Sequence, residues 1–235
     1  DSGQHRTGLL PDDPGVLGCA RILSGSANCE LSGTMTHGGH SYDCENIAEI
    51  KNVAEAERSA VVMAAGAICG IGLTCPIVSV GSTPTALHAE CLDGVTEMRP
   101  GVYMFGDLFQ CSIGSCNFDD LALSVLVSVN AWRADEQRAM VDAGALALSL
   151  DRGAPDGNGA YAFGMAADMN GAPLTGRPRI RQVNQEHGFL MGLRDRPDIG
   201  QRLRILPNHA CSTAAQYEIY HVIDGDGQIV DRWQR

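Results

Sequence analysis

The 235-residue sequence contains a single lysine, Lys51, among its 17 basic residues. Any reaction that needs a lysine side chain therefore has one candidate within this chain. No run of basic residues occurs, and the formal net charge is −11 at pH 7. Nucleic acids and anionic membranes attract positive charge, so neither is an expected partner. The composition favours a small-molecule partner.

Long apolar runs are also missing. The most apolar stretch, residues 59–73, is interrupted by three glycines, whereas a membrane helix needs about 20 apolar residues. The nine cysteines include no C-x-x-C pair, which favours reduced thiols. We therefore expect a soluble protein in a reducing compartment, the cytoplasm. Residue 1 is Asp and residues 1–8 look like a strand entering a loop, which indicates the later part of a longer protein.

The first 110 residues alternate between short apolar runs and segments with helical spacing. Asp12, Asp13 and Pro14 are typical of a helix start. Apolar residues recur at nearly helical spacing from Ile47 to Val61. Four strand ends are expected, at residues 1–8, 29–37, 76–82 and 95–101. Repeated strand and helix units predict parallel strands, in an open sheet or in a barrel.

After Phe105 the pattern changes to strand-like stretches separated by Gly, Asp and Pro turns. Residues 224–227 (DGDG) are typical of a hairpin turn. We place a boundary within residues 105–118. The prediction is an α/β domain over residues 1–110 and a mostly antiparallel β domain over residues 111–235.

Two consecutive strand ends have phosphate-binding character. Residues 82–85 lie between a strand and a helix, where hydroxyls and backbone N–H groups can cradle a phosphate. An ordinary helix cap explains the same residues and, taken alone, is favoured. Arg99, Gly101 and Tyr103 follow the next strand, although a turn after Pro100 also explains the glycine. Ligands of α/β folds bind at the carboxyl ends of neighbouring strands.

Three further sets of residues have both a functional and an ordinary explanation. His37 and His40 suit a metal site, but loop histidines are more common. Arg6 suits an anionic ligand or an exposed surface. Glu186 and His187 fit a general base and a hairpin turn about equally well.

His209 and Cys211 form an H-x-C pair at the end of residues 201–209, which we predict to be a strand that carries both side chains. Side chains two residues apart in a strand project to the same face. The pair can therefore converge on one metal ion, or it can point into a core and bind nothing. A single H-x-C motif does not decide between the two.

Taken together, these segments resemble, in order, the D-serine dehydratase and D-threonine aldolase family. That family consists of metal-activated pyridoxal-phosphate enzymes with an alanine-racemase-like fold. The resemblance covers nearly the whole chain and is carried by DSGQHRTG, THGGHSY, VGSTPTA, TEMRPGVYMF, DAGALALSLD, QEHG and PNHACST with YHVIDG. It implies a partial (β/α)8 barrel, its second half, in residues 1–110, followed by the β domain.

The resemblance also implies which residues hold pyridoxal phosphate. Segments that bind the cofactor phosphate are matched by Ser82, Thr83, Gly101 and Tyr103. Tyr42 matches the residue near the pyridine nitrogen, and Arg6 matches one beside the ring. The family's Schiff-base lysine lies near its N-terminus, in a part not present in this chain. Lys51, in the middle of an expected helix, is a poor substitute.

His209 and Cys211 match the pair that binds the family's metal beside the substrate hydroxyl. A soft thiolate ligand favours zinc over manganese or magnesium. Two departures from the family pattern concern details. Leu146 stands where members commonly have a lysine, and residues 184–188 (NQEHG) replace a more usual double glutamate.

The resemblance implies a lyase that acts on a small D-3-hydroxy amino acid. Dehydration of D-serine or a relative to an oxo acid and ammonia is the first expectation. The aldolase branch is the alternative, and an inactive fragment without the lysine is another. In the family, cysteine at the second ligand position goes with dehydratases and aspartate with aldolases. We expect a homodimer for the full-length protein and no activity for this chain alone.

Overall fold

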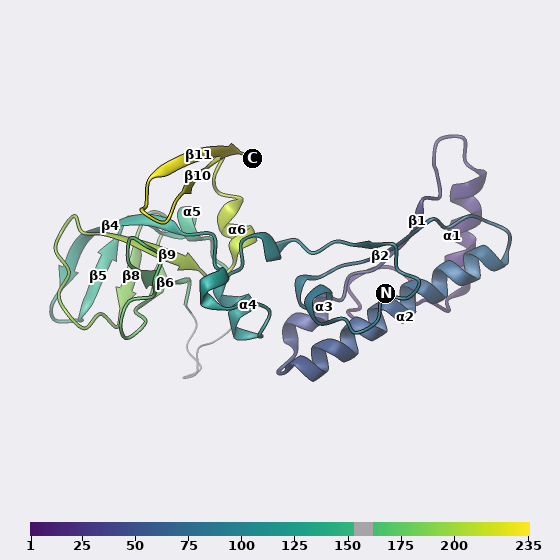
Figure 1. The fold of residues 1–235 in the computed structure, drawn as a ribbon, viewed down its shortest axis with the longest axis horizontal. Helices are drawn as coiled ribbons and strands as arrows, with labels where there is room; N and C mark the ends of the chain where they lie inside the picture. Colours follow the sequence, from purple (N-terminus) through teal and green to yellow (C-terminus); the bar gives the residue numbers. More distant parts are fainter. Residues whose placement is uncertain (153–161) are drawn as a thin grey trace. The chain divides into compact units, whose positions relative to one another are not determined.

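The computed structural model describes residues 1–152 and 162–235. They form two compact units, each with its own core (Figure 1). One comprises residues 1–103 and 113–115, and the other comprises residues 104–112 and 116–235. Within the described residues, no helix combines the length and the apolar character that a membrane crossing requires.

The first unit is built on a parallel sheet with strand order β1-β2-β3. Thr34 of β1 pairs with Val78 of β2, and Val80 of β2 pairs with Met98 of β3. The predicted alternation of strands and helices is confirmed in this unit. Its elements are α1 (Pro14–Gly25), β1 (Gly33–Met35), η1 (Gly39–Asp43), α2 (Ile47–Gly70), β2 (Ile77–Val80), α3 (Thr83–His88), β3 (Glu97–Met98) and η2 (Val102–Met104), whose last residue belongs to the second unit.

Local capping explains where the two long helices of this unit begin. The Asp13 carboxylate accepts a hydrogen bond from the N–H of Gly15 at 2.7 Å, so α1 begins at Pro14 as expected. Asn46 accepts from the N–H of Glu49 in the same way at the start of α2. Helix α2 then packs its apolar face on β1 and β2 (Figure 1).

The structure has three parallel strands in this unit where the sequence predicted four strand ends. Residues 1–8 form no strand, because the Asp1 carboxylate accepts hydrogen bonds from the N–H groups of Gly3 and His5. Gly3 and His5 both have positive φ, at 119° and 56°. This local turn replaces the extended conformation that the pattern predicted.

The second unit contains a closed antiparallel barrel with strand order β4-β5-β8-β7-β6-β9. A mostly antiparallel unit was expected, but its closure into a barrel was not. Fully buried aliphatic side chains such as Val141, Ile180, Leu190 and Ile205 fill the barrel core. The elements are α4 (Leu108–Ser112), η3 (Phe118–Asp120), β4 (Val125–Arg133), β5 (Arg138–Val141), α5 (Ala145–Leu148), β6 (Gly164–Ala167), β7 (Arg179–Val183), β8 (Gly188–Met191), β9 (Arg202–Pro207), α6 (Ala210–Ala214), β10 (Ile219–Ile223) and β11 (Ile229–Gln234).

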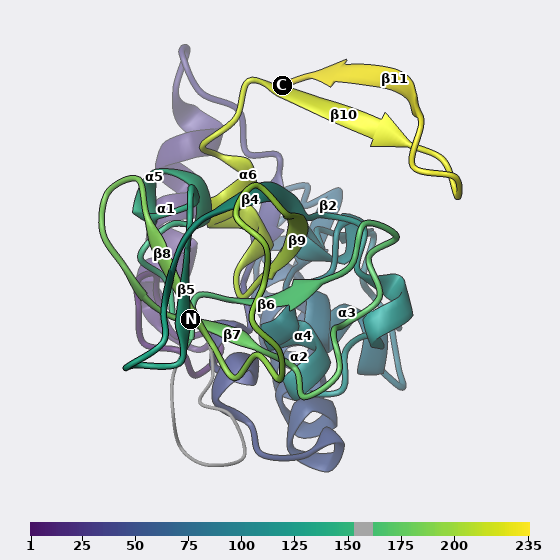
Figure 2. The same ribbon diagram turned by 90° about the vertical axis from the view of Figure 1, so that its left-hand side faces the viewer.

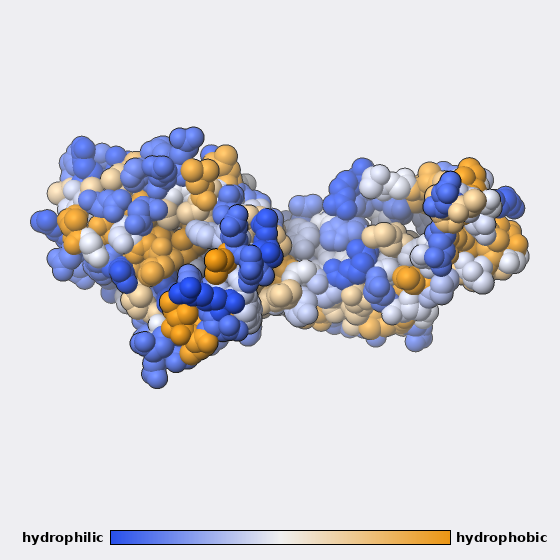
Figure 3. All heavy atoms as spheres, turned by 90° about the horizontal axis from the view of Figure 1, so that it is seen from above, coloured by the Kyte–Doolittle hydropathy of each residue, from blue (hydrophilic) through white to orange (hydrophobic). Residues whose placement is uncertain are grey.

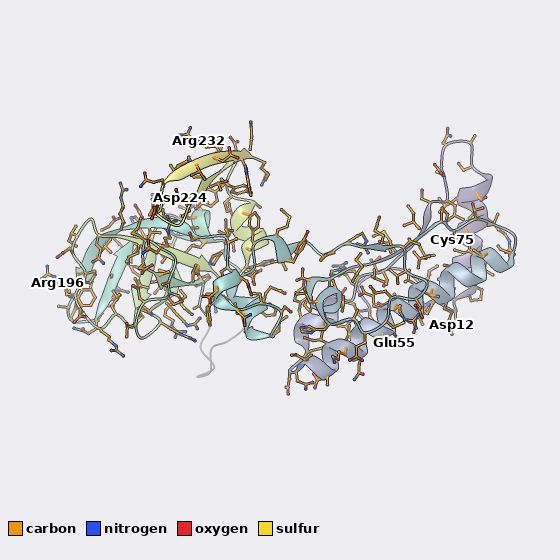
Figure 4. All side chains as sticks on the ribbon, in the orientation of Figure 1. Asp12, Glu55, Cys75, Arg196, Asp224 and Arg232 are labelled. Carbon is orange, nitrogen blue, oxygen red and sulfur yellow. The ribbon has the colours of Figure 1, made fainter. Side chains whose placement is uncertain are left out.

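Strands β10 and β11 form a separate antiparallel hairpin (Figure 2). The predicted turn is confirmed, since the N–H of Asp224 donates to the carbonyl of Gln228 at 3.0 Å. Asp224 is labelled in Figure 4. Val230 and Trp233 of β11 are 60% and 51% exposed. Hydrophobic residues thus remain on the surface among hydrophilic ones, as Figure 3 also shows.

Two predicted strands of this half are wrong in part. The stretch at residues 138–151 begins as β5, but its second part contains the short helix α5. The N–H groups of Ala145 and Leu146 donate to the carbonyls of Asn184 and Gln185, at 2.7 and 3.0 Å. The β7–β8 turn therefore binds the start of α5 and ends the extended conformation. The second case is the strand expected to continue through His209, because β9 ends at Pro207 and a helix follows.

Candidate functional site

The three parallel strands of the first unit end at one edge, and the predicted cofactor residues follow them. Neighbouring parallel strands bring their carboxyl ends together. The loop after β1 carries His37 and leads into η1 with Tyr42, whereas Ser82 and Thr83 follow β2. Gly101 and Tyr103 come after β3. The structure thus brings the two predicted phosphate loops to the same edge of the sheet.

A buried carboxylate, Glu57, joins two of these loops. Its Oε1 atom accepts hydrogen bonds from the N–H of Gly38 at 2.6 Å and from the N–H of Gly81 at 3.0 Å. Glu57 lies on α2 and is 1% exposed. The sequence prediction missed this residue, although Ile50, Ala54 and Glu57 have the spacing of a single helix face.

Hydroxyl groups connect the loops that follow β2 and β3. The Ser82 hydroxyl accepts from the N–H of Thr85 at 3.2 Å and lies 2.7 Å from the Thr85 hydroxyl. Ser82 therefore does cap α3, as the ordinary explanation held. The Thr83 hydroxyl accepts from the N–H of Tyr103 at 3.3 Å. Ser82, Thr83 and Thr85 are buried, whereas the Tyr103 side chain is 59% exposed.

Two arginines place positive charge at this edge, although the Glu97 carboxylate lies 3.8 Å from Nε of Arg99. Arg99 donates from Nε to the Ser79 hydroxyl at 2.7 Å and from Nη2 to the carbonyl of Thr36 at 2.5 Å. Burial, together with the positive charges of Arg6 and Arg99, holds the pKa of His37 below its usual value. A phosphate placed here would meet positive charge and hydroxyl groups.

The other candidates of this unit lie as follows. Arg6 is exposed, and Tyr42 is half-buried in η1. Gly101 is exposed, and a Cβ atom added to it would meet no neighbouring atom. The Nδ1 atom of His40 is buried without a hydrogen-bond partner. Lys51 forms an exposed ion pair with Glu90, with 2.5 Å between Nζ and Oε1.

The predicted metal pair lies in the second unit, but the strand that was expected to carry both side chains ends before them. Strand β9 ends at Pro207, and α6 begins at Ala210 with His209 as its N-cap residue. The two side chains therefore do not share a strand face. The carbonyl of His209 accepts from the N–H of Thr213 at 3.1 Å, which is the first turn of the helix.

A buried carboxylate also fixes this turn. Asp107 is 1% exposed, and its Oδ2 accepts from the N–H of Ala210 at 2.9 Å. Its Oδ1 accepts from the N–H of Gln110 at 2.8 Å, so one side chain holds the starts of α4 and α6. Burial raises the pKa of Asp107, against the opposing effect of these hydrogen bonds. Asn208, the residue before His209, is also fixed, because its side-chain amide donates to the carbonyls of Arg152 and Ala162.

His209 interacts with three side chains. Its Nδ1 is hydrogen-bonded to Oδ2 of Asp151 and lies 3.2 Å from the Ser212 hydroxyl. A hydrogen bond with Cys211 is the largest cause that raises the pKa of His209 to about 9; Asp151 contributes in the same direction, and burial opposes both. Cys211 therefore lies near the imidazole ring, and Nε2 is the ring nitrogen that does not bond Asp151.

The described residues contain no set of three or more His, Cys, Asp or Glu side chains arranged to hold a metal ion. A metal site with two protein ligands, His209 and Cys211, therefore remains a prediction.

Glu186 and His187 lie in the β7–β8 turn, where the N–H of Asn184 donates to the carbonyl of His187 at 2.8 Å. Their position fits the hairpin-turn explanation.

Two family models match the chain. The "Alanine racemase, N-terminal domain" matches residues 1–108, and the "Putative serine dehydratase domain" matches residues 122–223. The fold is that of the alanine-racemase-like proteins. Within this class, the chain belongs to the D-serine dehydratase and D-threonine aldolase family, which confirms the resemblance that the ordered motifs indicated.

Similar proteins include two dehydratases. D-threo-3-hydroxyaspartate dehydratase of Delftia sp. (strain HT23) is 43% identical over 244 residues, which cover 100% of this chain and 63% of that protein. D-serine dehydratase of Dictyostelium discoideum is 32% identical over 248 residues, covering 100% of this chain and 62% of that protein. This chain spans a little under two thirds of the length of these relatives.

Solved structures agree with this assignment. A cysteine-to-alanine mutant of D-threo-3-hydroxyaspartate dehydratase in the metal-free form has a TM-score of 0.91 and 42% identity, covering 100% of this chain and 64% of that one. D-threonine aldolase from Filomicrobium marinum has a TM-score of 0.80 and 24% identity, covering 100% and 60%. The aldolase shows a shared fold.

The Glu57 contacts predict a matched pair of stability changes. Glu57→Ala leaves the buried N–H groups of Gly38 and Gly81 without an acceptor. We expect the free energy of unfolding to fall by about 2–6 kcal/mol, roughly 1–3 for each unpaired donor. Glu55→Ala, an exposed position on the same helix (Figure 4), should change it little. Urea denaturation measures both, and equal losses would contradict the assignment.

Proposed function

We propose that this chain is part of a pyridoxal-phosphate- and zinc-dependent lyase that converts D-serine or a related D-3-hydroxy amino acid to an oxo acid and ammonia. The observation that carries the proposal is the placement of His209 and Cys211 together at the start of α6, with Nδ1 of His209 engaged by Asp151. The identity to two dehydratases over the whole chain supports the reaction type. The chain spans under two thirds of these relatives, so we propose the activity for a longer protein that contains it.

The donor atoms of the pair fit a zinc ion. Imidazole nitrogen and thiolate sulfur are common zinc ligands, and a catalytic site keeps positions open for water or substrate. Since Asp151 engages Nδ1 of His209, Nε2 is the nitrogen that remains for the ion. Exposed Cys211 supplies the sulfur. When bound, zinc supplies a Lewis acid for the substrate β-hydroxyl.

The strand-end edge of the first unit fits an anionic cofactor. The buried hydroxyls of Ser82 and Thr83 would face the phosphate, with the loop at Gly101 to Tyr103 beside them. Arg6 and Arg99 would contribute positive charge, as the lowered pKa of His37 indicates. When bound, pyridoxal phosphate supplies an electron sink for negative charge at the substrate α-carbon. In this proposal Tyr42 lies near the pyridine nitrogen and Arg6 beside the ring.

The aldolase branch is the second candidate, because D-threonine aldolase shares the fold. The thiol at position 211 favours the dehydratase, because the family resemblance associates cysteine at the second ligand position with dehydratases and aspartate with aldolases. A homodimer and a cytoplasmic location remain part of the proposal for the longer protein.

Zinc titration tests the metal pair. In competition with a chromophoric chelator, the chain should bind one zinc ion. His209→Ala and Cys211→Ala should each weaken binding by more than the roughly 10- to 100-fold that loss of an outer partner costs. Cys29→Ala, at an exposed thiol elsewhere, is the matched control and should bind like the original chain. A Cys29 effect as large as the Cys211 effect would refute the assignment.

Ammonia release tests the reaction. Supplied with pyridoxal phosphate and zinc, this chain alone should not release ammonia from D-serine, because Lys51 is held in an exposed ion pair with Glu90. A longer protein that includes an upstream strand-end lysine should release ammonia in a zinc-dependent reaction. Turnover by the chain alone at about 1 per second, typical of enzymes, would contradict this account.

A further inference from the structure

Asp151 and His209 are brought together by two short helices of the second unit. Asp151 follows α5, and 58 residues separate it from His209 in the sequence. The Thr213 hydroxyl in α6 donates to the carbonyl of Leu148 at 3.1 Å. The Tyr217 hydroxyl donates to the carbonyl of Ala147 at 3.2 Å. The end of α5 is thus bonded to the segment that carries the candidate metal ligands.

The segment between α5 and Asp151 has a defined conformation. Ser149 ends α5 with a φ of 69°, in the left-handed region that side chains rarely adopt. Its hydroxyl accepts from the N–H of Asp151 at 3.2 Å. A residue held in this conformation re-aims the chain, and here it turns the Asp151 carboxylate toward Nδ1 of His209.

The chemistry of this contact decides which imidazole nitrogen is available. A carboxylate accepts hydrogen bonds, so Nδ1 of a neutral His209 must carry the proton and Nε2 must carry the lone pair. Histidines that bind metals commonly donate their second N–H to a carboxylate, which fixes the ring orientation and raises ligand basicity. The Ser212 hydroxyl, 3.2 Å from Nδ1, is a weaker partner of the same atom.

We infer that Asp151 is a positioning residue for the zinc site: it holds the proton on Nδ1 of His209 and so presents Nε2 to the ion. This inference rests on the proposed function. Asp151 does not touch the ion, and it lies 58 positions before His209 in the sequence. The carboxylate also adds negative charge beside the ion, together with the Cys211 thiolate.

Zinc affinity of the chain, measured by chelator competition, is the first test. Asp151→Ala should weaken zinc binding by about 10- to 100-fold. Asp151→Asn keeps the shape but accepts a weaker hydrogen bond and lacks the charge, so it should lie between the original chain and Asp151→Ala. Asp135→Ala, at an exposed aspartate of the β4–β5 turn, is the control and should not change affinity.

Nitrogen-15 NMR of the zinc-loaded chain provides a readout that a purely structural role would not move. The His209 ring should show a protonated Nδ1 and a metal-bound Nε2. In Asp151→Ala this pattern should weaken, while the thermal midpoint of the metal-free chain stays close to its original value. Metal bound to Nδ1, or a zinc affinity of Asp151→Ala within twofold of the original, would overturn the role of Asp151 but not the metal site. If the unsubstituted chain bound no zinc, the metal site itself would fall, and Asp151 with it.

Discussion

The hydrogen bond from the N–H of Ala210 to the buried Asp107 carboxylate is the contact on which the candidate metal site depends. It ends the extended run of β9 and starts α6 directly after His209. Charged hydrogen bonds of this kind contribute about 1.5–3 kcal/mol each, and Asp107 makes a second one to Gln110. Without this anchor, the strand would continue through His209 and Cys211, and His209 would lose its contacts with Asp151 and Ser212.

Buried carboxylates organise both units in the same way. Glu57 holds two glycine N–H groups at the strand-end edge, and Asp107 holds two helix starts beside the metal pair. Neither carboxylate is exposed to a ligand, since each is 1% exposed. These carboxylates fix the backbone. Exposed or half-buried groups such as His209, Cys211 and Tyr103 remain accessible to a ligand or a metal ion. The proposed lyase therefore relies on loops that are fixed by acceptors inside each unit.

Much of the fold followed from local pattern, because capping residues and helical spacing are local signals. Asp13 caps α1 where the sequence predicted a helix start, and the family was recognisable from ordered motifs. The errors arose where distant residues decide. The β9 prediction failed because Asp107 lies about one hundred positions away, and the closure of the barrel depends on pairing between β4 and β9. Asp151 was missed for the same reason, although it stands at the end of the DAGALALSLD motif.

X-ray absorption at the zinc edge of the zinc-loaded chain tests whether His209 and Cys211 bind the ion. We expect one sulfur neighbour at about 2.3 Å and one imidazole nitrogen at about 2.0–2.1 Å, with light atoms from solvent in the open positions. The sulfur signal should disappear in Cys211→Ala. Zinc without any sulfur neighbour, or zinc closed by four protein ligands, would contradict a two-ligand site built on the turn between β9 and α6.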